Sequence, residues 1–198
     1  MPKLNTRLEV DRCPHCNIHT PNISQRTNLE TTASNNGKKR MWIIYVCASC
    51  GGVVTACSSA LKQEITEMYP RKMSVDNAIP EKAGEFLRQA QESLHAPAGS
   101  IMLCASCVDE MLKQKGLTEG SLYRRIEDAV QNNLITEDMS TWAHEVRLDA
   151  NDQRHADEGS TLPTEEGAKK CVIFASTLGH ILFVLPARVQ RGLSDASN

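Results

Sequence analysis

The chain has 198 residues, of which 40% are apolar and 23% are charged, and its formal charge is −2. This composition supports a folded core and excludes a disordered chain, and the small net charge excludes a strong overall field for nucleic acid or membrane. The charge is unevenly spread, because residues 1–75 carry 10 basic and 5 acidic side chains whereas residues 76–198 carry 12 and 19. The sequence therefore predicts two modules of opposite charge.

We expect neither a secretion signal nor a membrane segment. The first twelve residues are dotted with charges and lack the apolar core of a signal peptide. The longest apolar stretch, Cys171–Pro186, contains polar residues and is shorter than the roughly 20 residues that span a bilayer, so it is predicted to be a buried helix. A cytoplasmic location follows, where thiols stay reduced, and the eight cysteines then favour metal ligands over disulfides.

Residues 13–60 have the pattern of a small antiparallel sheet. Strands are expected at Ser24–Ala33, Arg40–Cys47 and Val53–Ser58, and the Asn-Gly pair at 36–37 favours a hairpin turn between the first two. A sheet of this size buries too little apolar surface to be stable alone. The module therefore needs an additional cross-link.

Two C-x-x-C pairs, 30 residues apart, provide that cross-link. Zn²⁺ prefers four thiolates in a tetrahedron, and two such turns supply all four. The sequence therefore predicts a structural zinc ribbon over residues 1–60. His15 and His19 are the nearby alternative ligands, and two turns with free thiols are the alternative without metal. The predicted zinc ligands are Cys13, Cys16, Cys47 and Cys50.

A proline-punctuated linker is expected at residues 61–80, followed by a helical module over residues 81–198. The apolar spacing, caps and breakers predict about five helices with short loops, which is typical of an up-and-down bundle. The predicted fold class is therefore α+β and mainly α. The helices are expected at 81–95, 101–115, 122–132, 137–156 and 165–185.

The other four cysteines are predicted to be packing residues. Cys104 and Cys107 share one face of a predicted helix, since residues three apart lie on the same side. Redox sensing and a metal site between subunits are the alternatives for this pair. Cys57 and Cys171 lie in apolar segments and are expected in the core.

A short basic run, Lys38-Lys39-Arg40, follows the predicted hairpin turn. Basic side chains at a hairpin tip are suited to contact a phosphate backbone, so these three are candidate nucleic-acid-binding residues. The alternative is that the run is simply solvated.

A polar stripe runs along the predicted helix at 137–156. Arg147, Asn151 and His155 are four residues apart, so they span only about 80° of the helix, and His144 falls in the same sector. A histidine can exchange a proton with a ribose 2′-OH, and an arginine can hold the phosphate. These three residues are therefore candidate catalytic residues, with a solvated helix flank as the alternative.

The string WAxxVRxxxNxxxH at residues 142–155, together with the order of zinc ribbon, linker and helical stretch, resembles the domain-of-unknown-function family 4145 over about residues 10–190. That family is a branch of the HEPN superfamily (higher eukaryote and prokaryote nucleotide-binding). The resemblance implies helical bundles that pair as dimers. Many such proteins are metal-independent endoribonucleases of phage defence or RNA processing, with an Arg-polar-x-x-x-His motif, and others are inactive scaffolds.

By this resemblance, His155 matches the motif histidine and Asn151 the polar residue, but Ala150 stands where the motif has arginine. Arg147 and Arg154 are the candidate replacements, and Arg154 is also a candidate nucleic-acid-binding residue. The first hypothesis is a dimeric HEPN-like protein that binds or processes RNA in a bacterial or phage defence system. The alternative is a non-catalytic zinc-ribbon adaptor for a nuclease or other protein, which the acidic helical module favours.

Overall fold

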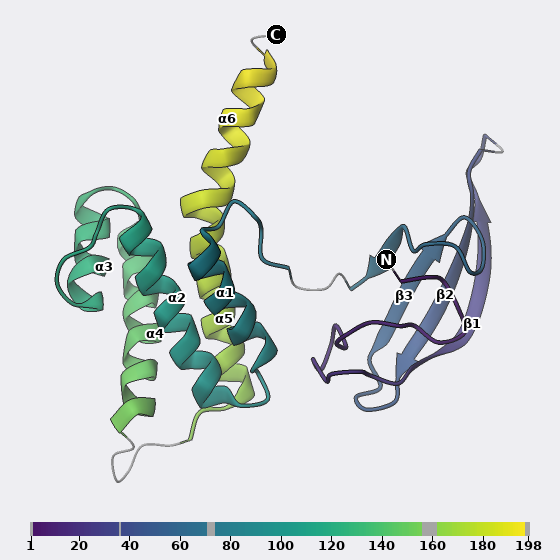
Figure 1. Cartoon of the computed structure of the whole chain (residues 1–198), viewed down its shortest axis with the longest axis horizontal. Coiled ribbons are helices and arrows are strands. Elements are labelled where there is room, and N and C mark those ends of the chain that lie inside the picture. The colour runs from purple at the N-terminus through teal and green to yellow at the C-terminus, as the bar shows by residue number, and fades with distance from the viewer. Residues whose placement is uncertain (1, 36, 71–73, 156–161, 197–198) are drawn as a thin grey trace. The chain divides into compact units, whose positions relative to one another are not determined.

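The computed structural model describes residues 2–35, 37–70, 74–155 and 162–196 (Figure 1). It divides the chain into two compact units, Met1–Met73 and Ser74–Asn198. Each unit has its own cluster of buried apolar side chains, and each is described by itself.

The first unit contains a four-stranded antiparallel sheet in the order β1-β2-β3-β4. Its strands are β1 (Ile23–Thr32), β2 (Lys39–Cys47), β3 (Val53–Ser58) and β4 (Glu67–Tyr69). The first three match the prediction, whereas β4 lies inside residues 61–80, which the sequence predicted to be a linker. Three residues are too few to show the alternation of a half-buried strand, and β4 forms by pairing with β3.

The core of the first unit lies on one face of this sheet. Alternate residues of β2, including Ile43 and Tyr45, are fully buried there against Leu4 and Leu8 of the segment that precedes β1. The Tyr45 hydroxyl donates a hydrogen bond of 2.7 Å to the carbonyl of Asn5. The segment that contains Leu4 and Leu8, which carries no strand pattern, therefore covers one face of the sheet.

The second unit is helical, which confirms the predicted mainly helical α+β class. Its helix α2 packs against α1, α3, α4 and α5, so it forms the centre of the bundle. The apolar side chains at its core come from all five of these helices. The elements are α1 (Glu81–Glu92), α2 (Pro97–Gln114), α3 (Leu122–Gln131), α4 (Glu137–His155), α5 (Glu165–Gly179), a π-helical turn (His180–Val184) and α6 (Leu185–Ala196).

Two prolines act differently from the prediction. The second helix was predicted to begin at residue 101, but α2 begins at Pro97, whose missing N–H is not needed in the first turn. The last helix was expected to stop before Pro186, but it continues as α6. The π-helical turn ends at Val184, two residues before this proline, and the Leu185 N–H bonds to the His180 carbonyl five residues back. The wider turn accommodates the missing N–H of the proline.

The helical run Glu165–Asp195 is, within the described part of the chain, the one that is long and apolar enough to cross a membrane by length and composition. Its first half packs into the bundle core, as predicted for a buried helix. Figure 1 shows α6 extending beyond the other helices of its unit. There Leu185, Val189 and Leu193 are exposed at four-residue spacing, and they are called the α6 stripe below.

Candidate metal centre and helical groove

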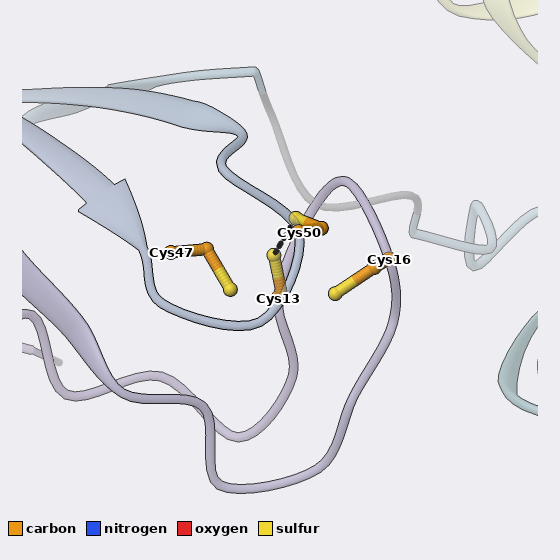
Figure 2. A group of neighbouring side chains, drawn as sticks. All are labelled: Cys13, Cys16, Cys47 and Cys50. Atoms are coloured by element: carbon orange, nitrogen blue, oxygen red, sulfur yellow. Dashed lines mark hydrogen bonds between the residues drawn. The ribbon is translucent and has the colours of Figure 1, made fainter.

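Four cysteine side chains from two loops converge on one point in the first unit (Figure 2). The sulfur atoms of Cys13, Cys16, Cys47 and Cys50 all lie within 4.8 Å of one another, and the Cys13 and Cys50 sulfurs are 4.0 Å apart. A tetrahedral zinc-thiolate site with Zn–S bonds of about 2.3 Å places its sulfurs roughly 3.8 Å apart. These four donors therefore fit a tetrahedral metal ion.

Backbone N–H groups are aimed at these sulfurs. The N–H of His15 is 3.4 Å from the Cys13 sulfur, and the N–H of Gly52 is 3.4 Å from the Cys50 sulfur. The second loop closes through Gly51, which adopts a φ of 70°, a conformation that glycine enters without steric cost. Each loop thus presents sulfurs that are already held for a metal.

The two alternative histidine ligands lie outside this cluster. The Nε2 of His15 donates a 2.7 Å hydrogen bond to the Val53 carbonyl, and its ring covers Gly52 so closely that a Cβ there would lie 2.5 Å from it. His19 has its Nδ1 3.4 Å from the hydroxyl of the neighbouring Thr20. Among the described residues, the candidate metal ligands on these two loops are the four cysteines alone.

The thiols affect one another's ionisation. Burial, together with the adjoining cysteines, raises the pKa of Cys16 to about 12. Burial also acts on Cys47, but hydrogen bonds from the Cys50 and Ser49 backbone outweigh it and lower the pKa of Cys47 to about 7. Four thiolates this close repel one another, so all four ionise together only around a cation.

The remaining cysteines are buried in the two cores. Burial raises the pKa of Cys107 and of Cys171 to about 12, and it also raises the pKa of Cys104. The Cys107 thiol donates to the Ala83 carbonyl at 3.2 Å. Thiols in this state are poor nucleophiles, which favours the predicted packing role over redox sensing.

The basic run after the hairpin turn is only partly available for a ligand. Lys38 and Lys39 are exposed, but Arg40 forms an ion pair of 2.9 Å with Glu67 of β4. A phosphate at this tip would therefore meet two lysines directly and would compete with a carboxylate for the arginine.

In the second unit, helices α1 to α4 line a groove of about 480 Å³, which is called the helical groove below. Two of the predicted catalytic residues, Arg147 and Asn151, lie in its wall. The side chains of the third, His155, and of Arg154 lie outside the described residues. The charged and aromatic residues that also line the groove include Lys82, Asp109, Glu110, Lys113, Tyr123 and Arg125.

Arg147 is the distinctive residue of this groove. Its Nε is buried without a hydrogen-bond partner, and its guanidinium carbon lies 5.4 Å from the centre of the Tyr123 ring. Among the described residues, no carboxylate or carbonyl group accepts a hydrogen bond from it. Among the described residues, the charge of Arg147 is thus held by an aromatic ring and meets no acceptor.

His144 points toward α3 and is not among the residues that line the groove. Its Nε2 is 2.8 Å from a carboxylate oxygen of Glu127, and its ring lies 4.8 Å from the Tyr123 ring. The Nδ1 atom is buried and has no hydrogen-bond partner in the described part of the chain. His144 therefore supports Tyr123, which in turn supports Arg147, rather than facing a ligand in the groove.

The other cations of the groove are paired. Arg125 bonds to Asp109 at 2.6 Å, and Lys113 contacts the other oxygen of the same carboxylate. Lys82 forms a 2.9 Å ion pair with Glu110, whose carboxyl group is buried. The lining contains four cations and two carboxylates, so its formal charge is +2 in a module that is acidic as a whole.

The Lys82–Glu110 pair gives a pH-dependent prediction. Lys82, and then Gln114, hold the pKa of Glu110 below its ordinary value of about 4.3, so the pair stabilises the fold above that pH and loses its effect as the carboxyl group protonates. We expect Glu110→Gln to lower the free energy of unfolding by about 1 kcal/mol at pH 7. Urea titrations should show this difference shrinking as the pH falls below about 4. A difference that is unchanged at pH 3 would contradict this role.

Sequence reasoning placed Arg147 and Asn151 together but missed most of the groove. Tyr123 and Lys82 lie 24 and 65 residues before Arg147 on other helices, and no spacing within α4 could reveal them. Of the adjacent pair Arg124 and Arg125, only Arg125 lines the groove, because Arg124 turns to an ion pair of 3.0 Å with Asp128.

A comparison with protein-family models places most of the helical unit in a known family. The model called Domain of unknown function (DUF4145) matches residues 88–195, more than half of the chain. Searches of curated proteins and of solved structures found no match. The matched segment contains Arg147 and Asn151, and the four clustered cysteines precede it. This chain is therefore a member of the DUF4145 family.

Proposed function

We propose that this protein binds RNA and that the helical groove receives the strand. The observation that carries the proposal is Arg147, a cation that has no acceptor among the described residues and stands in a groove with a formal charge of +2. Charged hydrogen bonds from arginine to phosphate are among the strongest that a protein makes. Asn151, in the same wall, offers an amide that can bond to a ribose or base.

We propose that the metal of the first unit is Zn²⁺ and that its role is structural. Four thiolates select Zn²⁺ over the harder cations, and a shell of four protein ligands leaves no open position for catalysis. When bound, the ion cross-links two loops of a unit with a small core. Lys38 and Lys39 then stand on a stable hairpin and give the RNA a second basic contact.

The stronger form of the proposal is metal-independent RNA cleavage at α4, as in HEPN endoribonucleases. His155 follows Asn151 by four residues on the same helix, and Arg147 and Arg154 are the cations nearest to it in sequence. In this form, His155 accepts the proton of a ribose 2′-OH while the cations stabilise the phosphate. Ala150 is 2% exposed, so an arginine there would have to leave the core, and this supports Arg147 as the replacement.

We further propose that the protein is a cytoplasmic, HEPN-like homodimer of a phage-defence system, paired through the polar flank of α4. Sedimentation at tens of micromolar should give a mass of twice the 21.9 kDa chain. A monomer at that concentration would contradict the dimer and any active site shared between subunits.

The direct test of RNA binding is fluorescence anisotropy with labelled single-stranded RNA. Arg147→Gln removes the unpaired cation and is expected to weaken binding by at least about tenfold, the value of one charged hydrogen bond. Arg124→Gln is the matched control, because Arg124 lies on α3 outside the groove. Equal RNA binding by the two variants would show that the groove is not the binding site. If the wild type binds no RNA, the proposed RNA-binding function is wrong.

The second candidate function is a non-catalytic adaptor. The α6 stripe favours it, since three large apolar side chains on one exposed helix are suited to a protein partner. The formal charge of the helical module, with 19 acidic and 12 basic side chains, also favours a protein over RNA. This function replaces the first one if the purified protein binds no RNA and a defence nuclease binds it through α6.

A further inference from the structure

The formal charge of the helical groove determines which anion balances it. Glu110 and Asp109 neutralise two of the four cations that line it, which leaves a charge of +2. Arg147 contributes one of these charges without any partner among the described residues. A single internal phosphodiester carries one negative charge, whereas a phosphate monoester carries about −1.5 to −2 at pH 7. The groove is therefore matched to a phosphate at the end of a chain.

The N-terminus of α3 adds a second source of positive potential. Ser121 caps this ten-residue helix by accepting a 3.4 Å hydrogen bond from the Arg124 N–H, and both Ser121 and Leu122 line the groove. The N–H groups of a first helical turn favour anions. Arg147, on α4, reaches the same groove from another wall, so two independent elements present positive charge to it.

The volume and one aromatic ring suit a nucleotide attached to that phosphate. The groove holds about 480 Å³, within the usual range for small-ligand sites. Tyr123 lines the groove and is 51% exposed, and its ring also contacts His144 and Arg147. The groove therefore offers a phosphate contact and, beside it, a partly exposed aromatic side chain.

We infer that the helical groove binds the phosphate monoester of a ribonucleotide, either at the phosphorylated end of an RNA or in a free mononucleotide. The inference rests on the proposed RNA binding and adds which phosphate enters the groove.

The test compares one RNA 12-mer in three forms, with a 5′-phosphate, with a 3′-phosphate, and with hydroxyl groups at both ends, together with AMP and adenosine. The full-length, zinc-loaded protein is expected to bind one phosphorylated form at least about tenfold more tightly than the hydroxyl form. Arg147→Gln should abolish this preference, and Arg124→Gln should keep it. Competition by AMP, but not by adenosine, would identify a free mononucleotide as a second source of the same group.

Two results separate the failure of this inference from failure of the proposed function. Equal affinity for all three RNA forms, with binding still dependent on Arg147, would overturn the end-phosphate inference and leave RNA binding intact. If no RNA is bound, the AMP and adenosine titrations decide, because equal or absent binding of both would overturn the inference as well. Retention of the preference in Arg147→Gln would also overturn it.

Discussion

Removal of the metal is expected to unfold the first unit while the helical unit remains folded. The described residues of the first unit form one small cluster of nine buried apolar side chains, and the four clustered sulfurs join the loops at residues 13–16 and 47–50. Structural zinc contributes about 10–16 kcal/mol of apparent binding free energy in small domains, which is more than such a core provides. Purified protein should contain one zinc per chain, and a strong chelator should abolish the sheet signals in NMR spectra but keep the helical ones.

Thiol titration provides a second readout of the same prediction. After chelation, the four clustered thiols should react with a disulfide reagent, whereas Cys104, Cys107 and Cys171 should react only in denaturant. Cys13→Ser should reproduce the effect of the chelator. Cys57→Ala is the matched control, since it removes a buried cysteine of the same sheet that lies outside the cluster. A zinc content near zero, with an intact sheet and eight titratable thiols, would contradict the prediction.

The sequence predicted the cysteine cluster because the pattern that defines it lies within two short segments. Two C-x-x-C pairs and an intervening hairpin specify a tetrahedral site whatever surrounds them. The parts of this unit that escaped prediction depend on distant partners. The segment of Leu4 and Leu8 becomes buried only because β2 presents Ile43 and Tyr45 to it, and β4 exists only as the neighbour of β3.

In the helical unit, too, local sequence predicted some features, and others depend on distant partners. Apolar periodicity and the residues that start and stop helices predicted the first residues of α1, α3, α4 and α5 correctly, and the structure shows Ser121 and Thr164 as caps of two of these helices. The helix boundaries near Pro97 and Pro186 were predicted wrongly, because a proline that begins a helix and one that follows a π-helical turn look like helix breakers in sequence. The polar stripe of α4 supplied two residues of the candidate site, Arg147 and Asn151. Most of the other lining residues, including Tyr123, belong to helices that only the tertiary fold brings beside α4.

If the protein cleaves RNA, replacing His155 by alanine is expected to lower the cleavage rate by at least about 100-fold, since a general base contributes about 10²- to 10⁴-fold. In the proposed reaction the ribose 2′-oxygen attacks the adjacent phosphorus, His155 takes its proton, and the 5′-oxygen of the next nucleotide leaves and is protonated. The products are a 2′,3′-cyclic phosphate and a 5′-hydroxyl. DNA lacks the attacking hydroxyl and should therefore be spared.

Three measurements make this prediction specific. The rate should be unchanged in EDTA over times too short for loss of structural zinc, and circular dichroism should show that His155→Ala keeps its helices. His144→Ala is the matched control, because His144 lies on the same helix but contacts Glu127 and Tyr123 instead of lining the groove. It should keep more activity than His155→Ala. Equal cleavage by the wild type and His155→Ala would reject the site assignment. If the wild type binds RNA but does not cleave it, catalysis is rejected and the binding function stands. Ala150, in place of the motif arginine, would then explain the lack of cleavage.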